Sequence, residues 1–538
     1  MQAAEPSRPL VGMATRHQAG RFRRLSLSGQ RPYLTAERHR RPRPRCLVEK
    51  ELLMPAANES DTGLSPVKLS RLSKRGVLLG LSVAQLIALA IGVASFIAGM
   101  MSGGTWMLYS AALWAPAVLI GFVPLGGRPI VEWLPVALHW TWRTMLGQTR
   151  YRARITRPRP AGTLALPGDA AALRQYADPV TKAVMVHDPH AQTLTALLEV
   201  HHSSFVLLDP GEQERRVQVW GRALATGCRS GRIARLQILE RAIPDSGSGL
   251  AKWWAEQGND DGSWVSETYK QLIDRAGPAG ERHISTISVS LDMKAAARQI
   301  RAAGRGLKGA AEVLRQEMRT LVTALRAADL EPSDWYGPGQ LSIMLRSAYD
   351  PEVSVALERA GGLGQDLATA GPVAVEEFWD RLRTDSGWHA VLWISEWPRS
   401  LTFPGFLSPV LLAGGVRRAF TLLCDPMRAD QAARDVRKRK TEHISDRTQR
   451  QRIGQIEDAT QSAELADVLQ QEADLVSGHG ALRYTGLIAI TAPTSDELDT
   501  AVSTIEQAAV QASCETRRLV GQQASAFAAA ALPLCRGL

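Results

Sequence analysis

Histidines and an aspartate that could bind a metal lie close together in the middle of this chain. They are His187, Asp188, His190, His201 and His202. Such a group could hold a transition-metal ion. However, Asp188-Pro189 is also a typical turn between two strand-like runs, and no fourth ligand stands at a fixed spacing. The sequence therefore favours a structural β-hairpin. A membrane-tethered, metal-dependent enzyme that uses the His187/His201 region stays open as an alternative.

Nucleotide chemistry has little support in the sequence. The chain contains no Gly-Lys dipeptide, which excludes a P-loop. A formal G-x-G-x-x-G is present at Gly304, Gly306 and Gly309. In a dinucleotide site this motif follows a strand directly, but here it follows an Ala-rich helical segment. We therefore interpret it as a break between two helices.

Motifs for nucleophilic or acid–base catalysis are equally weak. The sequence has no G-x-S-x-G elbow. We interpret Glu376, Glu377 and Glu396 as surface carboxylates. The tryptophans of the body are interpreted as packing residues: Trp253, Trp254, Trp393 and Trp397. No catalytic, cofactor-binding or metal-binding residue is predicted, and the expected role is non-enzymatic.

The longest uncharged segment runs from Gly76 to Gly127. It holds two apolar stretches, 76–101 and 106–123, and each is long enough to cross a bilayer. Gly103 and Gly104 lie in the polar gap between the stretches and are expected to form the turn. The segment therefore predicts a two-helix transmembrane hairpin.

Positive charge gathers on both sides of this hairpin. Residues 1–50 carry a net charge of +9 and residues 51–160 a net charge of +7, so the total of +11 leaves −5 for the remaining residues. Arg and Lys beside a span mark the cytoplasmic side. We expect a multi-pass protein of the plasma membrane with both termini in the cytoplasm. The acidic balance of the body argues against direct nucleic-acid contact.

A segment rich in Trp and Arg follows the hairpin. Trp at the membrane interface, followed by Arg directed toward water, is typical of a helix that lies in the head-group plane. The residues expected to anchor the chain at the membrane are Trp106, Trp133, Trp140, Arg143, Arg150, Arg152 and Arg154. A helix packed on the soluble body is the alternative.

The remaining sequence predicts an α+β protein whose cytosolic region is built from α/β lobes. The expected parts are a disordered basic tail (1–64), the hairpin (65–127), an amphipathic juxtamembrane helix and linker (128–162), and two lobes (163–335 and 336–538), the second with a long exposed helix. Translation from Met54, which would remove most of the tail, stays open. The scattered cysteines fit a reduced compartment, and no internal repeat is evident.

The predicted strands are 183–187, 193–201, 235–240, 283–292, 389–396, 419–424 and 484–490. The predicted helices are 211–228, 295–328, 373–383, 428–441, 446–476 and 495–512.

Several segments together resemble a known family. They include GRPIVEWLPVALHWTWRTMLGQTRYRAR, VMVHDPHAQTLTALLEV, PDSGSGLAKWW, SEWPRS and QQASAFAAAALPL. In these segments the chain resembles actinobacterial conjugation-associated integral membrane proteins, from about Ser65 onward. The family looks like a PrgI-type membrane hairpin joined to the N-terminal, non-motor part of the type IV secretion ATPases.

The resemblance implies a subunit of a conjugative DNA-transfer apparatus of an integrative element. Its expected partners are the lipid bilayer, a separate type IV secretion or conjugation ATPase, other membrane subunits and further copies of itself. No cofactor is implied. A membrane subunit of a type VII (ESX-like) secretion system is the alternative, because its hairpin component has a similar layout.

Overall fold

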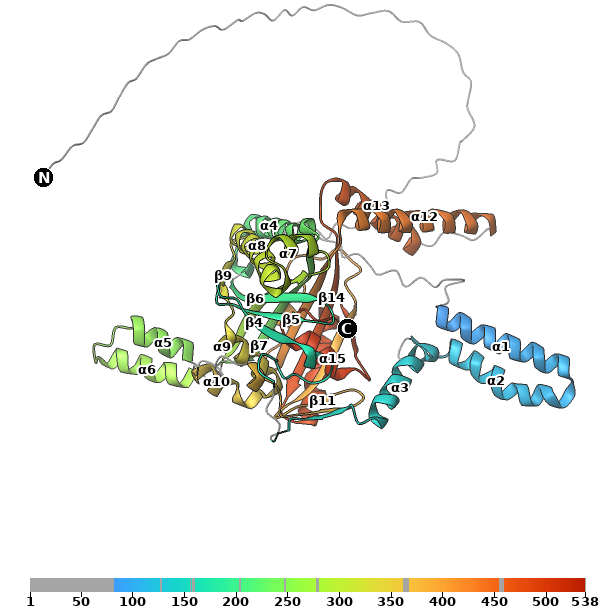
Figure 1. The fold of residues 1–538 in the computed structure, drawn as a ribbon, viewed down its shortest axis with the longest axis horizontal. Helices are drawn as coiled ribbons and strands as arrows, with labels where there is room; N and C mark the ends of the chain where they lie inside the picture. Colours follow the sequence, from blue (N-terminus) through green and yellow to red (C-terminus); the bar gives the residue numbers. More distant parts are fainter. Residues whose placement is uncertain are drawn as a thin grey trace, which may run out of the picture. The chain divides into compact units, whose positions relative to one another are not determined.

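The computed structural model describes residues 82–537 except 126–127, 155, 157–159, 203–204, 246–247, 277–279, 361–366 and 454–458 (Figure 1). The predicted tail (1–64), the first residues of the first apolar stretch and the basic residues before it (Lys68, Arg71, Lys74 and Arg75) lie outside this range. The same holds for Gly126, Gly127, Arg157 and Arg159.

The described chain is an α+β structure. The helices are α1 (Val83–Ser102), α2 (Gly104–Phe122), α3 (Ile130–Met145), α4 (Pro210–Ser230), α5 (Ser248–Gln257), α6 (Trp264–Ala276), α7 (Ala297–Ala302), α8 (Gly306–Ala327), α9 (Pro338–Tyr349), α10 (Ser354–Ala360), α11 (Ser408–Leu411), α12 (Ala429–Ile453), α13 (Ala459–Val476), α14 (Ser495–Gln511) and α15 (Gln523–Ala531).

The strands are β1 (Pro124–Leu125), β2 (Arg128–Pro129), β3 (Arg150–Arg152), β4 (Arg174–Ala177), β5 (Val184–Asp188), β6 (Thr193–His201), β7 (Ile233–Pro244), β8 (Glu281–Asp292), β9 (Glu331–Trp335), β10 (Ala374–Glu377), β11 (Leu382–Arg383), β12 (Trp388–Glu396), β13 (Arg417–Pro426), β14 (Leu482–Ala492) and β15 (Glu515–Arg518). All except β1 and β2 belong to one 13-stranded sheet.

The sheet contains the same unit twice. The first unit runs β6-α4-β7-β8-α8-β9, and the second runs β12-α11-β13-β14-α14-β15. In both, the third strand lies between the first and the second, and the fourth strand pairs with the other side of the first. This is the β-α-β-β-α-β order of a ferredoxin-like unit. The first and fourth strands of each unit also share a register shift, after Leu198 and after Ile394.

This duplication differs from the expectation that the chain has no internal repeat. The units match in topology, but α4 is a long helix and α11 is a single turn. The predicted boundary near residue 335 falls between the units. They nevertheless share one sheet, because β7 and β13 pair antiparallel from Arg418↔Ala242 to Cys424↔Leu236.

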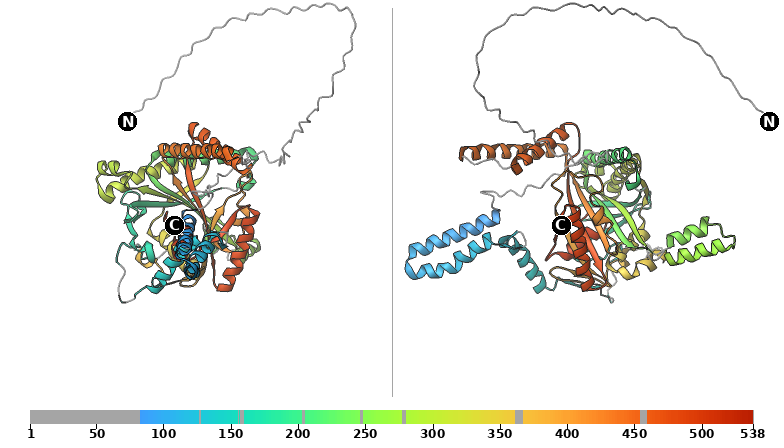
Figure 2. Two further views of the ribbon diagram at one scale, coloured as in Figure 1. Left: turned by 90° about the vertical axis from the view of Figure 1, so that its right-hand side faces the viewer. Right: turned by 180° about the vertical axis from the view of Figure 1, so that it is seen from behind.

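Each unit inserts a helical pair between its second and third strands. The pair α5–α6 follows β7, and the pair α12–α13 follows β13; α12 and α13 lie side by side in all views (Figures 1 and 2). Since β7 and β13 are antiparallel, the two insertions leave opposite ends of their shared ladder. The long polar helix or helical hairpin predicted at 446–476 corresponds to the end of α12 and to α13.

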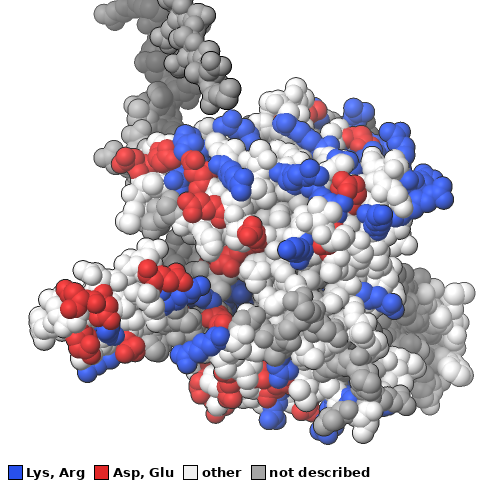
Figure 3. Space-filling view, turned by 60° about the vertical axis from the view of Figure 1, so that its left-hand side comes forward, with Lys and Arg blue, Asp and Glu red and all other residues white. Residues whose placement is uncertain are grey.

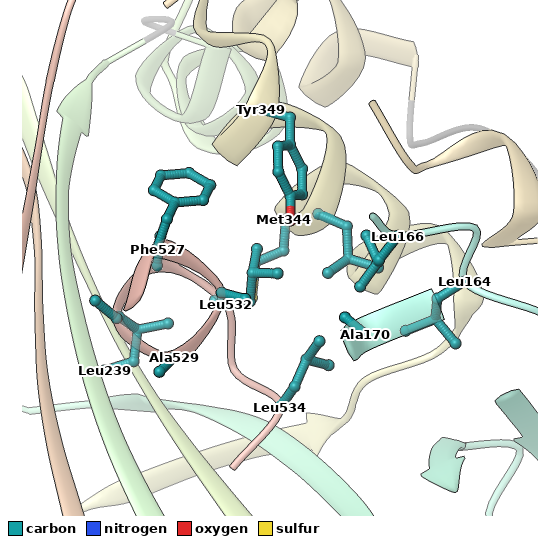
Figure 4. Close-up of a cluster of buried hydrophobic side chains, with 14 of the residues drawn as sticks. Leu164, Leu166, Ala170, Leu239, Met344, Tyr349, Phe527, Ala529, Leu532 and Leu534 are labelled. Carbon is teal, nitrogen blue, oxygen red and sulfur yellow. The ribbon is translucent and has the colours of Figure 1, made fainter. Parts of the chain in front are cut away.

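The two faces of the sheet carry different cores. On one face, α4 and α8 cover the first unit and α14 covers the second. The other face has a single large cluster that continues across both units and is covered by α9 and α15. There Tyr349 packs edge-on against Phe527 with ring centroids 5.3 Å apart (Figure 4). Leu532 and Leu534 extend this cluster beyond α15.

The hydrogen bonds of α15 connect it to strands of both units. The fully buried Gln237 of β7 donates to the carbonyls of Ala529 and Leu532 and accepts from the amide of Cys535. Thr421 of β13 donates to the carbonyl of Ala530. The C-terminal helix therefore covers the joint between the units.

All seven predicted strands are present, as β5, β6, β7, β8, β12, β13 and β14. The predicted helix at 373–383 is wrong, because this segment forms β10 and β11. Its partner β3 lies more than 200 residues earlier, and this long-range pairing decides its conformation. The predicted helix at 295–328 is interrupted between α7 and α8.

Candidate functional site

The apolar hairpin is formed by α1 and α2. Both helices are long and apolar enough to cross a membrane. Ser82 caps α1 with a capping box. The side-chain amide of Gln85 donates to the backbone carbonyl of Gly121 on α2. Gly103 has a φ of +82°, which glycine adopts without strain, and it joins the helices directly to each other. The predicted turn at Gly103 and Gly104 is therefore observed, although Gly104 is already the first residue of α2.

Small residues form the contact between the two helices. Ala88, Gly92 and Gly99 are buried on α1. A Cβ added to Gly99 would lie 2.0 Å from Oγ of Ser110, and one added to Gly92 would lie 3.3 Å from Val118. Close packing through small residues is typical of helix pairs in membranes. The large apolar side chains are exposed instead, among them Met100, Trp106, Leu108, Tyr109 and Leu113.

Helix α3 has one face on the body. The indole of Trp140 packs edge-on against that of Trp379, with centroids 5.8 Å apart. Val136 closely approaches Gly521, where a Cβ would lie 3.0 Å from Val136 Cγ1. These contacts correspond to the alternative in which the helix packs on the soluble body. Trp140 thus has a protein neighbour, which the expectation of a lipid-facing side chain did not include.

The opposite face of α3 is also apolar, and it is exposed. Leu138, Trp142 and Met145 are 68%, 65% and 79% exposed, and Leu134 is 41% exposed. Their spacing of four, four and three residues places them along one side of a helix. Sequence reasoning missed this stripe because it selected only the Trp133–Trp140 side. The signal was present in the sequence as a second apolar series with helical spacing, which begins one residue after Trp133.

A buried ion pair connects α3 to the C-terminal helix. Nη2 of Arg143 lies 2.6 Å from Oε2 of Glu377, whose side chain is 2% exposed. Oε1 of the same carboxylate accepts from the amide of Ala524, in the first turn of α15. Arg143 also donates to the carbonyl of Gly521. The expectation that Glu377 is a surface carboxylate is therefore wrong. Arg143 is a bridging residue within the protein.

The strand after α3 completes the connection. β3 pairs with β10 at the end of the sheet, and Arg150 forms a more exposed ion pair with Glu376 at 2.9 Å. Arg150, Arg152 and Arg154 are exposed, and Trp133 is partly buried. Trp106 lies near the hairpin turn and is 63% exposed. A membrane contact of these residues stays a prediction.

The predicted histidine hairpin is confirmed as a structural element. β5 and β6 pair antiparallel, with His187 opposite Leu194, and His201 pairs with Glu331 of β9. The two histidines therefore lie far apart along the sheet. Asp188 accepts from the amides of His190 and Ala191, as a turn-initiating aspartate does. Burial lowers the pKa of His187.

No group of three or more His, Cys, Asp or Glu residues able to hold a metal ion lies within the described part of the chain. The predicted placement of the G-x-G-x-x-G is confirmed: Gly304 lies between α7 and α8, and Gly306 and Gly309 lie in the first turns of α8. Among the tryptophans, Trp254 stacks on Tyr269 and Trp397 packs on Tyr484.

No protein-family model matches this chain, and no curated protein matches it. The family resemblance in the sequence therefore stays a prediction. The geometry itself defines the candidate site: a junction at which an apolar helical hairpin is fixed to a large sheet through α3, β3 and the Arg143–Glu377 pair.

Proposed function

We propose that this chain is a non-enzymatic, membrane-anchored subunit of a conjugative, type IV secretion-like DNA-transfer apparatus. In this role the hairpin crosses the plasma membrane twice, and both termini are cytoplasmic. The body then serves as the docking platform for a separate ATPase and for neighbouring subunits.

The observation that supports this role most directly is the way the hairpin is joined to the body. A flexible tether would only keep the body near a membrane. Here Arg143 and Glu377 connect α3 to α15, and α15 in turn bonds to strands of both units. A direct connection between hairpin and body, as seen here, suits a subunit that must hold a partner protein at a fixed distance from the bilayer.

The exposed stripe on α3 supports a position at the membrane surface. With its other face on the body, α3 can place Leu138, Trp142 and Met145 at the head-group boundary. The non-enzymatic part of the proposal rests on the sequence, which has no P-loop and no nucleophile elbow. The choice of a conjugative system rests on the family resemblance.

Topology can be tested by labelling with a membrane-impermeant maleimide. The four described cysteines are buried, so their background labelling is low once Cys46 is replaced by Ser. We expect Gly104→Cys to be labelled in intact cells and Thr320→Cys, at an exposed position of α8, only after lysis. Labelling of Thr320→Cys in intact cells would overturn the proposed orientation.

Docking can be tested by cross-linking in native membranes and purification in mild detergent. We expect a secretion-class ATPase to co-purify with the chain. Glu377→Gln should weaken this recovery because it removes the ion pair that connects α3 to α15, whereas Glu376→Gln, at the neighbouring exposed pair, should not. Recovery as a lone monomer under every condition would contradict the docking role.

A further inference from the structure

A basic surface lies on α7, on the start of α8 and on the turns that precede them. Its members are exposed and fall within fifteen consecutive residues: Lys294, Arg298, Arg301, Arg305 and Lys308. No Asp or Glu occurs between Met293 and Ala311. In Figure 3, Lys and Arg predominate over Asp and Glu in the upper part of the molecule. Figure 1 shows that α4, α7 and α8 lie in this upper part. We call these five residues the basic surface.

The charges of the basic surface are available to a ligand. None of the five side chains forms an ion pair with another residue in the part of the chain that the structure describes. Helix α12 carries more cations, but acidic residues of α12 and of its neighbour α13 neutralise several of them. Arg434 pairs with Asp430 at 2.7 Å, and Lys440 pairs with Glu472 of α13 at 2.6 Å. Paired charges such as those on α12 are typical of a solvated helix. The basic surface differs because its cations form no ion pairs among the described residues.

The helices beneath the basic surface are closely packed. α7 and α8 cross so closely that a Cβ on Gly309 would lie 2.4 Å from the carbonyl oxygen of Ile300. Arg305, between the helices, has a φ of +62° and a ψ of 170°, a conformation that glycine tolerates far better than arginine. A cation is thus held at a strained position where a glycine would be easier to accommodate.

The composition of the basic surface indicates the ligand. Three of the five cations are arginines, whose planar guanidinium binds phosphate oxygens in pairs. No large hydrophobic side chain is exposed among the described residues of α4, α7 and α8. The surface therefore has no apolar group to insert into a bilayer and no exposed aromatic ring to stack on unpaired bases.

We propose that the basic surface on α7–α8 binds the phosphate backbone of double-stranded nucleic acid without reading its sequence. The net charge of −5 outside the first 160 residues argued against such contact, but this sum hides a local group of unpaired cations. This binding goes beyond the docking role and requires no ATPase partner, so either proposal can fail without the other.

The experiment measures binding of the full chain, in zwitterionic nanodiscs, to a fluorescent duplex of arbitrary sequence. Five phosphate contacts predict that log K falls with log [salt] with a slope of about −4.5. The triple variant Arg298→Glu/Arg301→Glu/Lys308→Glu should lose about 100-fold in affinity at constant salt. The triple variant Lys252→Glu/Arg275→Glu/Arg359→Glu has the same change in net charge on other elements, and should lose less than about threefold.

Arg305→Gly keeps the test independent of folding. Glycine relieves the positive φ, so the melting temperature should not fall, while the salt slope should become shallower by about 0.9. Equal losses in the two triple variants would overturn the proposal, because net charge alone would then explain binding. Tighter binding to phosphatidylserine vesicles or to single-stranded DNA than to the duplex would also overturn it.

Discussion

Buried polar side chains connect distant parts of this protein at the level of single residues. His389 of β12 is one of them: it is fully buried and lies between the hydroxyls of Thr384 and Thr491, at 2.7 and 2.9 Å. The Thr384 hydroxyl donates to the carbonyl of Tyr349, so it accepts from Nε2–H of a neutral imidazole. Burial, with a smaller effect from Arg417, lowers the pKa of His389 to about 3.

This depressed pKa predicts acid sensitivity. Between the ordinary pKa of 6.5 and the folded value of about 3, the unfolded chain binds a proton that the folded chain does not. The contribution of His389 to stability is therefore complete above about pH 6.5. Below that pH, this contribution to the free energy of unfolding falls by about 1.4 kcal/mol for each pH unit, until the pH reaches the folded pKa.

Urea unfolding of the wild type and of His389→Gln at pH 7 and pH 5 measures this contribution. The difference in unfolding free energy between the two proteins should shrink toward the lower pH. A difference that is the same at both pH values would show that His389 does not carry this dependence.

At the scale of elements, glycines at the helix contact set how closely α1 approaches α2. At Gly99 an added side chain meets Ser110, whereas at Gly104 nothing lies within 4 Å of the added Cβ. Gly99→Val should therefore separate the helices at a cost of about 1–3 kcal/mol, and Gly104→Val should leave them in place.

A disulfide reports this separation, because a Cβ on Gly121 would lie 3.6 Å from Cβ of Ala88, within bonding range for paired cysteines. In an Ala88→Cys/Gly121→Cys background, oxidation in nanodiscs should give less cross-linked product with Gly99→Val and an unchanged yield with Gly104→Val. Unchanged cross-linking with both would mean that the hairpin does not pack through Gly99.

Local pattern predicted the long strands and most of the long helices, because their apolar series is visible in a short window. It failed where the partner is remote. β10 was predicted as helix because β3, which pairs with it, is distant, and Glu377 was taken for a surface group because Arg143 lies 234 residues away. The repeat was missed because the two units share connectivity while their connecting segments differ in length.

At the scale of the whole molecule, α15 makes the two units depend on each other. Gln237→Leu would leave the amide of Cys535 and the carbonyl of Leu532 buried without partners, at a cost of about 2–5 kcal/mol. Hydrogen exchange should then show β7 and β13 losing protection together. The control Gln218→Leu removes an exposed bond to Glu214 and should change stability by less than about 0.5 kcal/mol. Loss of protection confined to one unit would contradict this coupling.

The seven paired positions between β7 and β13 also determine how the body can be divided. When the chain is cut within residues 336–373, each fragment has one of these strands as a bare edge. A bare edge pairs with any strand that it meets, so either fragment alone is prone to aggregate. The edges are each other's natural complement, and co-expressed fragments should reassemble. Reassembly through the β7–β13 ladder could therefore be used in a split-protein reporter, in which the two fragments report on the folding of this protein.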